Sequence, residues 1–429
     1  MSADVTKLDR DRIRELFDLR SETNAGHGGS YDVDPYPAFH RLRTSGPIHE
    51  GVVHRLIGYD GEAFFQGLPY PDRPHFSVFS FAECDEAFRN SEVFVSHPNP
   101  EDPSPDRDGI GVQSSMLNMN GAQHRRYRGL VQPSFVPNKA KWWIERWIDD
   151  TVQALAANLE ELERADLNID FAAAIPVLTI TGSFGIGVEE ALDLRETLRE
   201  SAYGDAHDRF VGILEPILRA RRESPEDDLI SVLAHAEMRD DDGVVHRLSD
   251  AEIYSFSYLL LAAGSGTTWK QMGIVLSLLL ERPELMAAVR ADRALLRPVI
   301  EEAVRWSVTD PMFSRFVAED TELGGVPLPA GAVVHLCTGA ANRDPARWSD
   351  PDVYDPYRPP QPNLGFGGGA HICLGMHVAR AEMFTGISAL LDRFPEMRLD
   401  PDEPAPRIIG IYERGPDAVP VVLGPPAST

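Results

Sequence analysis

The chain has 429 residues and a formal net charge of −26, from 67 acidic and 41 basic residues. So acidic a chain argues against nucleic acid as a partner, because phosphate binding needs clustered cations. Its three cysteines, Cys84, Cys337 and Cys373, are too few for a disulfide framework and match no zinc spacing, which favours a reducing compartment such as the cytoplasm. The first twenty residues have no apolar core of the signal-peptide type. The longest apolar segment, roughly 256–280, is broken by polar residues and indicates a buried helix without membrane insertion.

The first quarter of the chain combines short elements of different kinds. The polar residues 1–33 form a lead-in, and turn residues with apolar spacing predict a short helix within 34–50. Alternation of apolar and polar residues predicts a β-rich stretch over 51–80, with "HFSVFSF" as its clearest strand. A short helix at "AECDEAFRN" and a long loop over 91–115 follow.

Helices dominate the remainder. Several are expected between 121 and about 238. Ser249 and Glu252 fit a capping box that opens a helix over about 250–281, ended by Pro283. The further elements are a helix over about 294–307, strands at "FSRFVAED", "VPLP" and "AVVHLCTG", a proline-rich irregular stretch over 351–365, a helix over 373–393 and a β-like tail. This order predicts a mainly α protein with small β-sheets, in a single domain over 34–429.

Cys373 stands at the end of a glycine-rich loop, "FGGGAHICLG". One interpretation is a buried structural thiol, the reading given to Cys84 and Cys337. A second is a dinucleotide fingerprint, since Gly365–Ala370 fits GxGxxA and Asp392 follows about twenty residues on. That motif must follow a buried strand, whereas "YDPYRPPQPNL" cannot be a central strand.

The third interpretation is a thiolate metal ligand. Glycines permit close approach of a large flat cofactor, and a helix N-terminus after Cys373 would stabilise the thiolate charge. A single thiolate without partner Cys or His ligands does not suit zinc or an iron–sulfur cluster. It suits the axial position of haem iron, where the porphyrin supplies four ligands.

Residues 366–375 resemble the FGxGxHxCxG haem-binding loop of the cytochromes P450. "DPYPAFHRLRTSGP", "HRRYRGLVQPSF", "EEAVRW" and "ANRDPARWSDPDVYDPYRP" resemble the soluble bacterial members, from about Asp34 to the C-terminus. The resemblance implies the cytochrome P450-like fold, haem b, O2 as co-substrate and Cys373 as the iron ligand, with Phe366, Gly367 and Gly375 in the loop against the haem.

The resemblance also assigns polar residues around the haem. Glu302 and Arg305 match the ExxR motif, with Arg358 as the third member of a structural support. His124, Arg128, Arg315 and His371 match the partners of the haem propionates, which need cationic or hydrogen-bonding groups.

"LAAGSGTTW", residues 261–269, places glycines and threonines in the middle of the long helix, where they are poor helix formers. One explanation is a kink from a threonine bonding back to a carbonyl one turn earlier. The resemblance implies the oxygen-binding groove, with Thr267 as the proton-handling hydroxyl and Ala263 and Gly264 leaving room above the iron. Most relatives carry an acid immediately before that threonine, but this chain has Gly266.

The substrate pocket and the redox partner are likewise inferred from the resemblance. It implies a pocket lined by Leu117, Leu259, Ala263, Met312, Phe313 and Ile411. Residues 109–144 contain no acid, and their basic side chains would form a docking patch for an acidic ferredoxin: Arg125, Arg126, Lys139 and Lys141, beside Arg128.

The predicted function is a haem-thiolate monooxygenase that inserts one oxygen atom from O2 into an apolar small organic substrate, with NAD(P)H electrons delivered by a separate ferredoxin system. Two alternatives stay open. Gly266 is the reason to consider a peroxygenase or isomerase, and a haem-based binding protein without turnover is the other.

Overall fold

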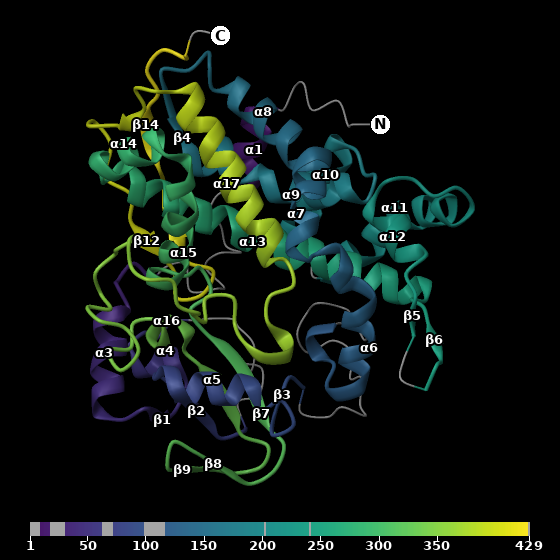
Figure 1. Cartoon of the computed structure of the whole chain (residues 1–429), viewed down its shortest axis with the longest axis vertical. Helices are drawn as coiled ribbons and strands as arrows, with labels where there is room; N and C mark the ends of the chain where they lie inside the picture. Colours follow the sequence, from purple (N-terminus) through teal and green to yellow (C-terminus); the bar gives the residue numbers. More distant parts are fainter. Residues whose placement is uncertain are drawn as a thin grey trace.

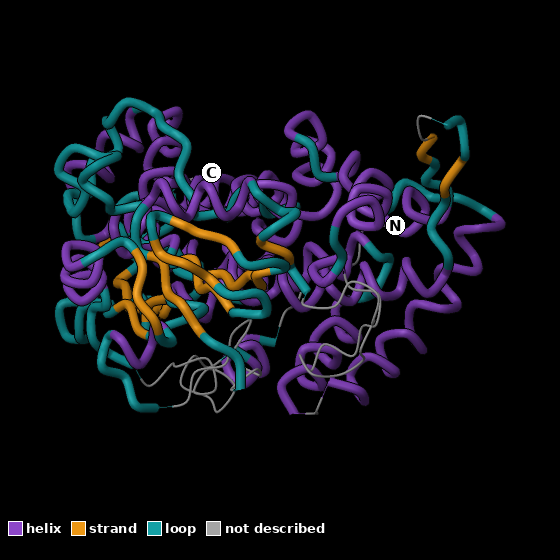
Figure 2. The backbone as a smooth tube through the Cα atoms, turned by 90° about the horizontal axis from the view of Figure 1, so that it is seen from below, coloured by secondary structure: helices purple, strands orange, loops and turns teal. Residues whose placement is uncertain are grey.

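The computed structural model describes residues 9–17, 31–61, 72–97, 116–200, 203–239 and 242–427. Part of the expected lead-in, the middle of the 51–80 stretch and most of the 91–115 loop lie outside these ranges. Figure 1 shows a large helical part above a smaller part that holds β1 (Ile48–Glu50), β2 (His75–Val78) and β7 (Phe313–Val317) beside the helices α3 (Tyr36–Ser45), α4 (Val53–Leu56), α5 (Phe81–Arg89) and α16 (Thr338–Ala341). In Figure 2, turned by 90°, the longer strands gather in one half of the molecule and helices fill the other.

One long helix, α13 (Asp250–Leu280), runs through the interior. Its capping box is formed, since the Ser249 hydroxyl accepts from the Glu252 N–H and the Glu252 carboxylate accepts from the Ser249 N–H. Its 31 residues span about 47 Å at 1.5 Å per residue. It packs on α9 (Ala174–Ser183), α15 (Leu296–Trp306) and α17 (Met376–Arg393), so the prediction of a buried central helix is confirmed.

Most of the other described α-helices lie around this centre, whereas α3, α4, α5 and α16 lie in the part that holds the main sheet. The other described helices are α1 (Arg10–Leu16), α3 (Tyr36–Ser45), α4 (Val53–Leu56), α5 (Phe81–Arg89), α6 (Gly121–Val131), α7 (Ala140–Trp143), α8 (Asp149–Asn158), α10 (Val188–Glu200), α11 (Tyr203–Glu223), α12 (Leu229–Ala234), α14 (Pro283–Ala291) and α16 (Thr338–Ala341). In the part of the chain that the structure describes, no single helix is long and apolar enough to cross a membrane; a bent pair, 168–183 with 188–197, reaches that length only when both are counted.

The main sheet joins distant parts of the chain. Its order is β1 (Ile48–Glu50), β2 (His75–Val78), β10 (Val333–Leu336), β7 (Phe313–Val317) and β3 (Phe94–Val95). Within this described sheet, only the β2–β10 pair is parallel, with His75 opposite Val333. The smaller sheets are β4 (Arg164–Asp166) with β14 (Pro420–Val422) and β11 (Arg398–Leu399), β5 (Met238–Arg239) with β6 (Val245–His246), β8 (Thr321–Leu323) with β9 (Val326–Leu328), and β12 (Ile408–Ile409) with β13 (Gly415–Pro416).

Several segments differ from the sequence-based expectation, among them α14, which was not predicted, and α16, which begins within an expected strand. Val53–Leu56, expected in a β-rich stretch, form the helical turn α4, which ends before Gly58 at a φ of 88°. Within the expected polar lead-in, α1 buries Ile13 and Leu16 against the main core. The last helix begins at Met376 and not at Cys373. The reason is that the Cys373 N–H donates to the Phe366 carbonyl, 2.9 Å away, and so belongs to the preceding loop.

Candidate functional site

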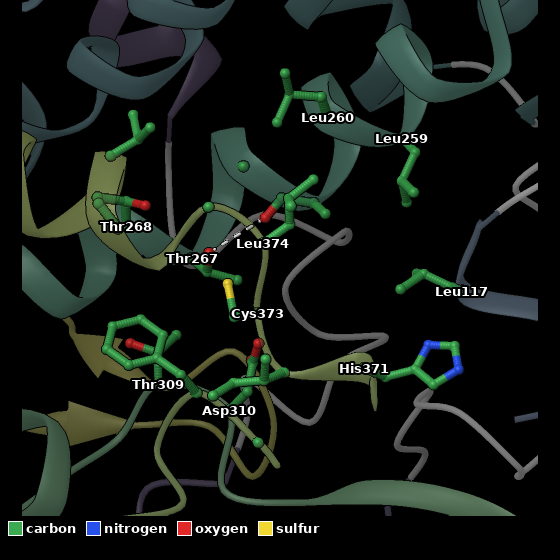
Figure 3. Close-up of a pocket in the computed structure, with 18 of the residues that line it drawn as sticks. Leu117, Leu259, Leu260, Thr267, Thr268, Thr309, Asp310, His371, Cys373 and Leu374 are labelled. Atoms are coloured by element: carbon green, nitrogen blue, oxygen red, sulfur yellow. Dashed lines mark hydrogen bonds between the residues drawn. The ribbon is translucent and has the colours of Figure 1, made fainter. Parts of the chain in front are cut away.

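A cavity of about 410 Å³ lies between α13 and the glycine loop 366–375. Figure 3 shows side chains from several elements pointing into it, among them Thr267, Cys373 and His371. Ala263 is exposed although it lies in the middle of the central helix, because its side chain opens onto this internal space. Cys373 is exposed in the same way, since its sulfur faces the cavity and not the outer surface.

The glycine loop is held tightly against α5. Gly367 and Gly369 have φ values of 69° and 63°, in the left-handed region that favours glycine. A Cβ at Gly369 would lie only 1.8 Å from the Phe88 carbonyl oxygen. The loop therefore needs glycine at 369 for its backbone conformation and for its close approach to α5.

Gly369→Ala should accordingly destabilise the loop, because α5 or the loop must move to admit the methyl group. The left-handed backbone alone costs about 1–2 kcal/mol, and the clash with the Phe88 carbonyl adds to it. Thermal unfolding followed through cofactor absorbance measures the loss. Gly212→Ala, at an exposed position in a helix away from the cavity, is the control, since nothing lies within 4 Å of a Cβ there. Equal stability of the two variants would contradict this account.

The Cys373 thiol stands in a mixed electrostatic environment. Burial raises its pKa, and the negative charge of Asp310 acts in the same direction. The Gly375 N–H, which hydrogen-bonds to the sulfur, and the charges of Arg128 and Arg380 oppose this rise in the pKa. The donors and cations around the sulfur are those that favour a thiolate.

Donors from three segments converge beside the loop. The rings of His124 and His371 stack with centroids 3.9 Å apart. Arg128 donates to the carbonyls of Ala370 and Ile372 at 2.9 and 2.7 Å. Arg315 is buried on β7, and burial lowers its pKa to about 10. Three of the four expected propionate partners line the cavity, whereas His124 lies behind His371.

These residues fit a flat group that carries carboxylates, as expected for haem. The Nε2 atom of His124 is buried without a hydrogen-bond partner among the described residues. Burial and then neighbouring cations lower the pKa of His124 to about 4, so an anion beside it would relieve an unfavourable environment. Within the described ranges, no group of three or more His, Cys, Asp or Glu is arranged to hold a metal ion.

The Glu302–Arg305 pair lies outside the cavity and is fully engaged. Two nitrogens of Arg305 donate to the Glu302 carboxylate at 2.7 and 2.8 Å. The same guanidinium donates to the carbonyls of Asn342, Pro351 and Val353. The Nε atom of Arg358 lies 3.5 Å from Glu302. The three residues thus come together and hold the irregular stretch that leads to the glycine loop.

The central helix faces the loop through Ala263 and Thr267. The Thr267 hydroxyl donates to the Ala263 carbonyl at 3.2 Å, the back-bond considered as the structural alternative. Gly264 borders the cavity, and a Cβ there would lie 2.5 Å from the Ile180 Cδ1 atom, so this glycine also permits packing against α9. Gly266 does not line the cavity.

Three of the expected pocket residues, Leu117, Leu259 and Phe313, line the cavity together with Ala263. Met312 and Ile411 do not: both are 1% exposed and pack in a separate core cluster. Phe313 begins β7, and adjacent side chains of an extended backbone point to opposite sides, which accounts for the different position of Met312. Tyr412 lines the cavity where its neighbour Ile411 was expected.

Sequence reasoning missed the polar part of the wall. Asp310, Tyr412, Glu413 and Gln271 border the cavity although the pocket was expected to be apolar. Glu413 lies in a turn between two short strands that has no motif. Its left-handed φ of 49° is visible only in the structure.

Only part of the expected basic patch is available, because two of its four side chains are ion-paired with acids. Arg125 and Lys139 are exposed, and Lys139 lies over the Trp142 ring. Arg126 is ion-paired with Glu252, and Lys141 lies 3.4 Å from Glu145. The positive charge available on this surface is therefore smaller than the sequence suggests.

Comparisons with known proteins agree with this site. The family model described as Cytochrome P450 matches residues 191–410. The chain is 34% identical to nocardicin C N-oxygenase of Nocardia uniformis subsp. tsuyamanensis, over 72% of this chain and 79% of that protein. It is 29% identical to the cytochrome P450 monooxygenase PikC of Streptomyces venezuelae, over 87% of each.

The fold gives the same result. The crystal structure of CYP109E1 from Bacillus megaterium with testosterone matches with a TM-score of 0.75 and 26% identity, over 91% of this chain and all of that one. Family, fold and the cavity behind a glycine-loop cysteine lead to one conclusion: the chain belongs to the cytochrome P450 family and is a haem-thiolate monooxygenase that uses haem iron and O2.

Proposed function

We propose that Cys373 is the axial ligand of the haem iron and that Arg128, Arg315 and His371 bind the propionates, with His124 supporting His371. The observation that carries the proposal is the Cys373 sulfur, which opens onto a cavity whose opposite wall includes Ala263 and Thr267 of α13. Phe366, Gly367 and Gly375 form the cavity floor around the sulfur. Cys84 and Cys337 are wholly buried and have only structural roles; three free thiols are in keeping with the cytoplasm.

When bound, haem supplies the redox chemistry that splits dioxygen. The chain's own residues position the substrate, exclude water from the reacting centre and deliver protons. Leu117, Leu259 and Phe313 give the cavity an apolar wall that displaces water from the reacting centre. The Thr267 hydroxyl would hold a proton at its Oγ1 atom, where it now bonds the Ala263 carbonyl.

The substrate is an apolar small organic molecule in this proposal. The apolar wall supports this class, and the related CYP109E1 was crystallised with testosterone. The test is the ferric absorption spectrum of the purified protein, titrated with testosterone, a long-chain fatty acid and a small aromatic compound. A shift in spin state with one compound would identify the class to examine for turnover. A protein without thiolate-type haem would overturn the proposal.

Electrons reach the site from a separate ferredoxin, through the surface that carries Arg125 and Lys139. Both side chains are exposed, and no ion pair holds either one among the described contacts. Arg125 lies within α6, and Lys139 directly precedes α7. Arg128 of α6 touches the glycine loop, so this surface is adjacent to the side of the site that carries Cys373.

Neutralising both charges, Arg125→Gln with Lys139→Gln, should slow reduction by an acidic ferredoxin about 5- to 10-fold at low salt. The difference should disappear above about 0.3 M salt, where screening removes it. Stopped-flow reduction measures the rate, and haem content should stay unchanged. Arg398→Gln is the matched control, because Arg398 is also exposed but lies on β11, outside the proposed docking surface. Equal rates for the double variant and this control would rule out docking on this surface.

A further inference from the structure

The central helix has no side chain at Gly266, but a carboxyl group from another part of the chain stands beside that position. A Cβ built on Gly266 would lie 3.4 Å from Oε2 and 3.7 Å from Oε1 of Glu413. The space into which an acidic residue at 266 would extend is therefore already bordered by an acid. Glu413 comes from the turn between β12 and β13, and its side chain borders the same cavity as Thr267.

Contacts hold Glu413 in this position although its backbone conformation is unfavourable. Its φ of 49° is in the left-handed region, which costs a residue other than glycine about 1–2 kcal/mol. Lys270, one turn after Gly266 on α13, donates from Nζ to the Glu413 carboxylate, and the Lys270 side chain is only 2% exposed. The next residue, Arg414, donates its N–H to the Thr309 carbonyl at 2.8 Å. The strained turn is thus tied both to α13 and to the segment after α15.

Asp310 completes the group. It borders the cavity, and its Oδ1 atom is buried with no hydrogen-bond partner among the described residues. Burial and then the charge of Glu413 raise the pKa of Asp310 to about 7, against the opposing effects of Lys270 and the Glu413 N–H. The groups that face it are Lys270 from α13, Tyr412 and Glu413 from the C-terminal turn, and Cys373 from the glycine loop. Near neutral pH, Asp310 is therefore protonated in part, and its titration is coupled to that of the neighbouring carboxyl group.

The reaction of a monooxygenase consumes protons, because one oxygen atom of O2 leaves as water. We propose that Glu413 replaces the acid that the central helix lacks at Gly266, as a positioning residue that passes protons toward the Thr267 hydroxyl, with Asp310 as the neighbouring proton store. Figure 3 shows Thr267, Cys373 and Asp310 around one part of the cavity. This inference rests on the function proposed above.

The proton balance is simple. The Asp310–Glu413 pair gives up its shared proton to a water or hydroxyl at Thr267, which leaves two carboxylates facing Lys270. A proton from bulk water then restores the pair. Water in the cavity can carry that proton to Glu413, since its side chain borders the cavity and is 24% exposed, whereas that of Lys270 is almost wholly buried.

The first test measures the fate of O2 in substrate-free holoenzyme reduced by a ferredoxin and its reductase. Loss of proton delivery should divert O2 from water to hydrogen peroxide, so Glu413→Gln should raise the peroxide-to-water ratio about tenfold. Glu413→Asp should be intermediate. Gly266→Asp in the Glu413→Gln background should restore the wild-type ratio, because it returns an acid to the same space. Glu322→Gln, an exposed glutamate on β8, is the control. Unchanged peroxide in Glu413→Gln, or no rescue by Gly266→Asp, overturns the proposal.

The second test does not depend on turnover. Infrared spectra of ferric holoenzyme labelled with 13C-aspartate, recorded from about pH 5 to about pH 9, should contain a protonated carboxyl band that disappears near pH 7 and is missing in Asp310→Asn. Glu413→Gln should move its midpoint to lower pH, because a nearby negative charge has been removed. A midpoint that Glu413→Gln does not move would mean that the two carboxyls share no proton, against the proposal.

A third measurement separates proton delivery from substrate binding. Dodecyltrimethylammonium and dodecanol are matched cationic and neutral probes for the spin-state titration. If Glu413→Gln weakened only the cationic probe and left the peroxide ratio unchanged, the carboxylates would bind a substrate cation and the proposal would be wrong. Absence of a thiolate-type spectrum in the wild type would instead overturn the function on which it rests.

Discussion

Replacing Arg305 by leucine will lower the free energy of unfolding by about 3–5 kcal/mol and reduce the yield of haem-loaded protein, because a buried ion pair is broken from one side. Arg305 is 1% exposed and makes five hydrogen bonds, two to Glu302 and three to backbone carbonyls. After substitution by leucine, the partners that the Glu302 carboxylate keeps are the Asp355 N–H, 3.0 Å away, and Arg358. Denaturant unfolding followed through haem absorbance measures the loss.

Two controls make this prediction specific. Arg305→Lys keeps the charge but loses the planar fork that reaches several carbonyls at once, so its stability should be intermediate. Arg398→Gln removes an exposed arginine and should change the stability by less than about 0.5 kcal/mol. If Arg305→Leu unfolded at the same denaturant concentration as the wild type, the Glu302–Arg305 pair would have no role in holding the stretch before the glycine loop.

Replacing Cys373 by serine will abolish the thiolate-type spectrum of the reduced, carbon monoxide-bound protein and lower monooxygenation on the order of 10³-fold or more. The thiolate is the group that donates electron density to the iron in the proposed site, and a serine hydroxyl remains neutral at physiological pH. The measurement is the reduced carbon monoxide difference spectrum, followed by product formation with any compound that shifts the spin state.

The chain offers its own controls for this cysteine. Cys84 and Cys337 are wholly buried, and burial raises the pKa of both thiols well above the usual range. Cys84→Ala and Cys337→Ala should retain the thiolate-type spectrum, with at most a packing cost. A Cys373→Ser protein with an unaltered spectrum would assign the iron ligand to another residue.

Much of this architecture can be predicted from the sequence. The capping box at Ser249 and the apolar run behind it locate α13, since both signals are local. The glycine loop is recognisable because its residue types are required by its geometry, as Gly369 against the Phe88 carbonyl demonstrates. Features that depend on local chain chemistry can therefore be predicted from the residues alone.

Long-range contacts cannot be predicted in that way. Nothing local distinguishes Phe313 from Met312, yet only Phe313 of the two reaches the cavity. Glu413 lies far from Gly266 in the sequence, and its role depends on a turn that returns to α13 only in the folded chain. The ion pair that neutralises Arg126 comes from the distant Glu252, so counting charges along one segment overestimates the free positive surface.

The parallel pairing of β2 with β10 has a consequence for how the protein matures. His75 meets Val333 only after a closure that spans more than half of the chain, and such pairings form slowly. Arg315, which lines the cavity, lies on β7, the other neighbour of β10 in the same sheet. We therefore expect the nascent chain to bring its two halves together before it retains its cofactor, which would make haem capture a late event in biogenesis. Supply of haem during expression should accordingly affect how much chain survives proteolysis more than how fast it folds.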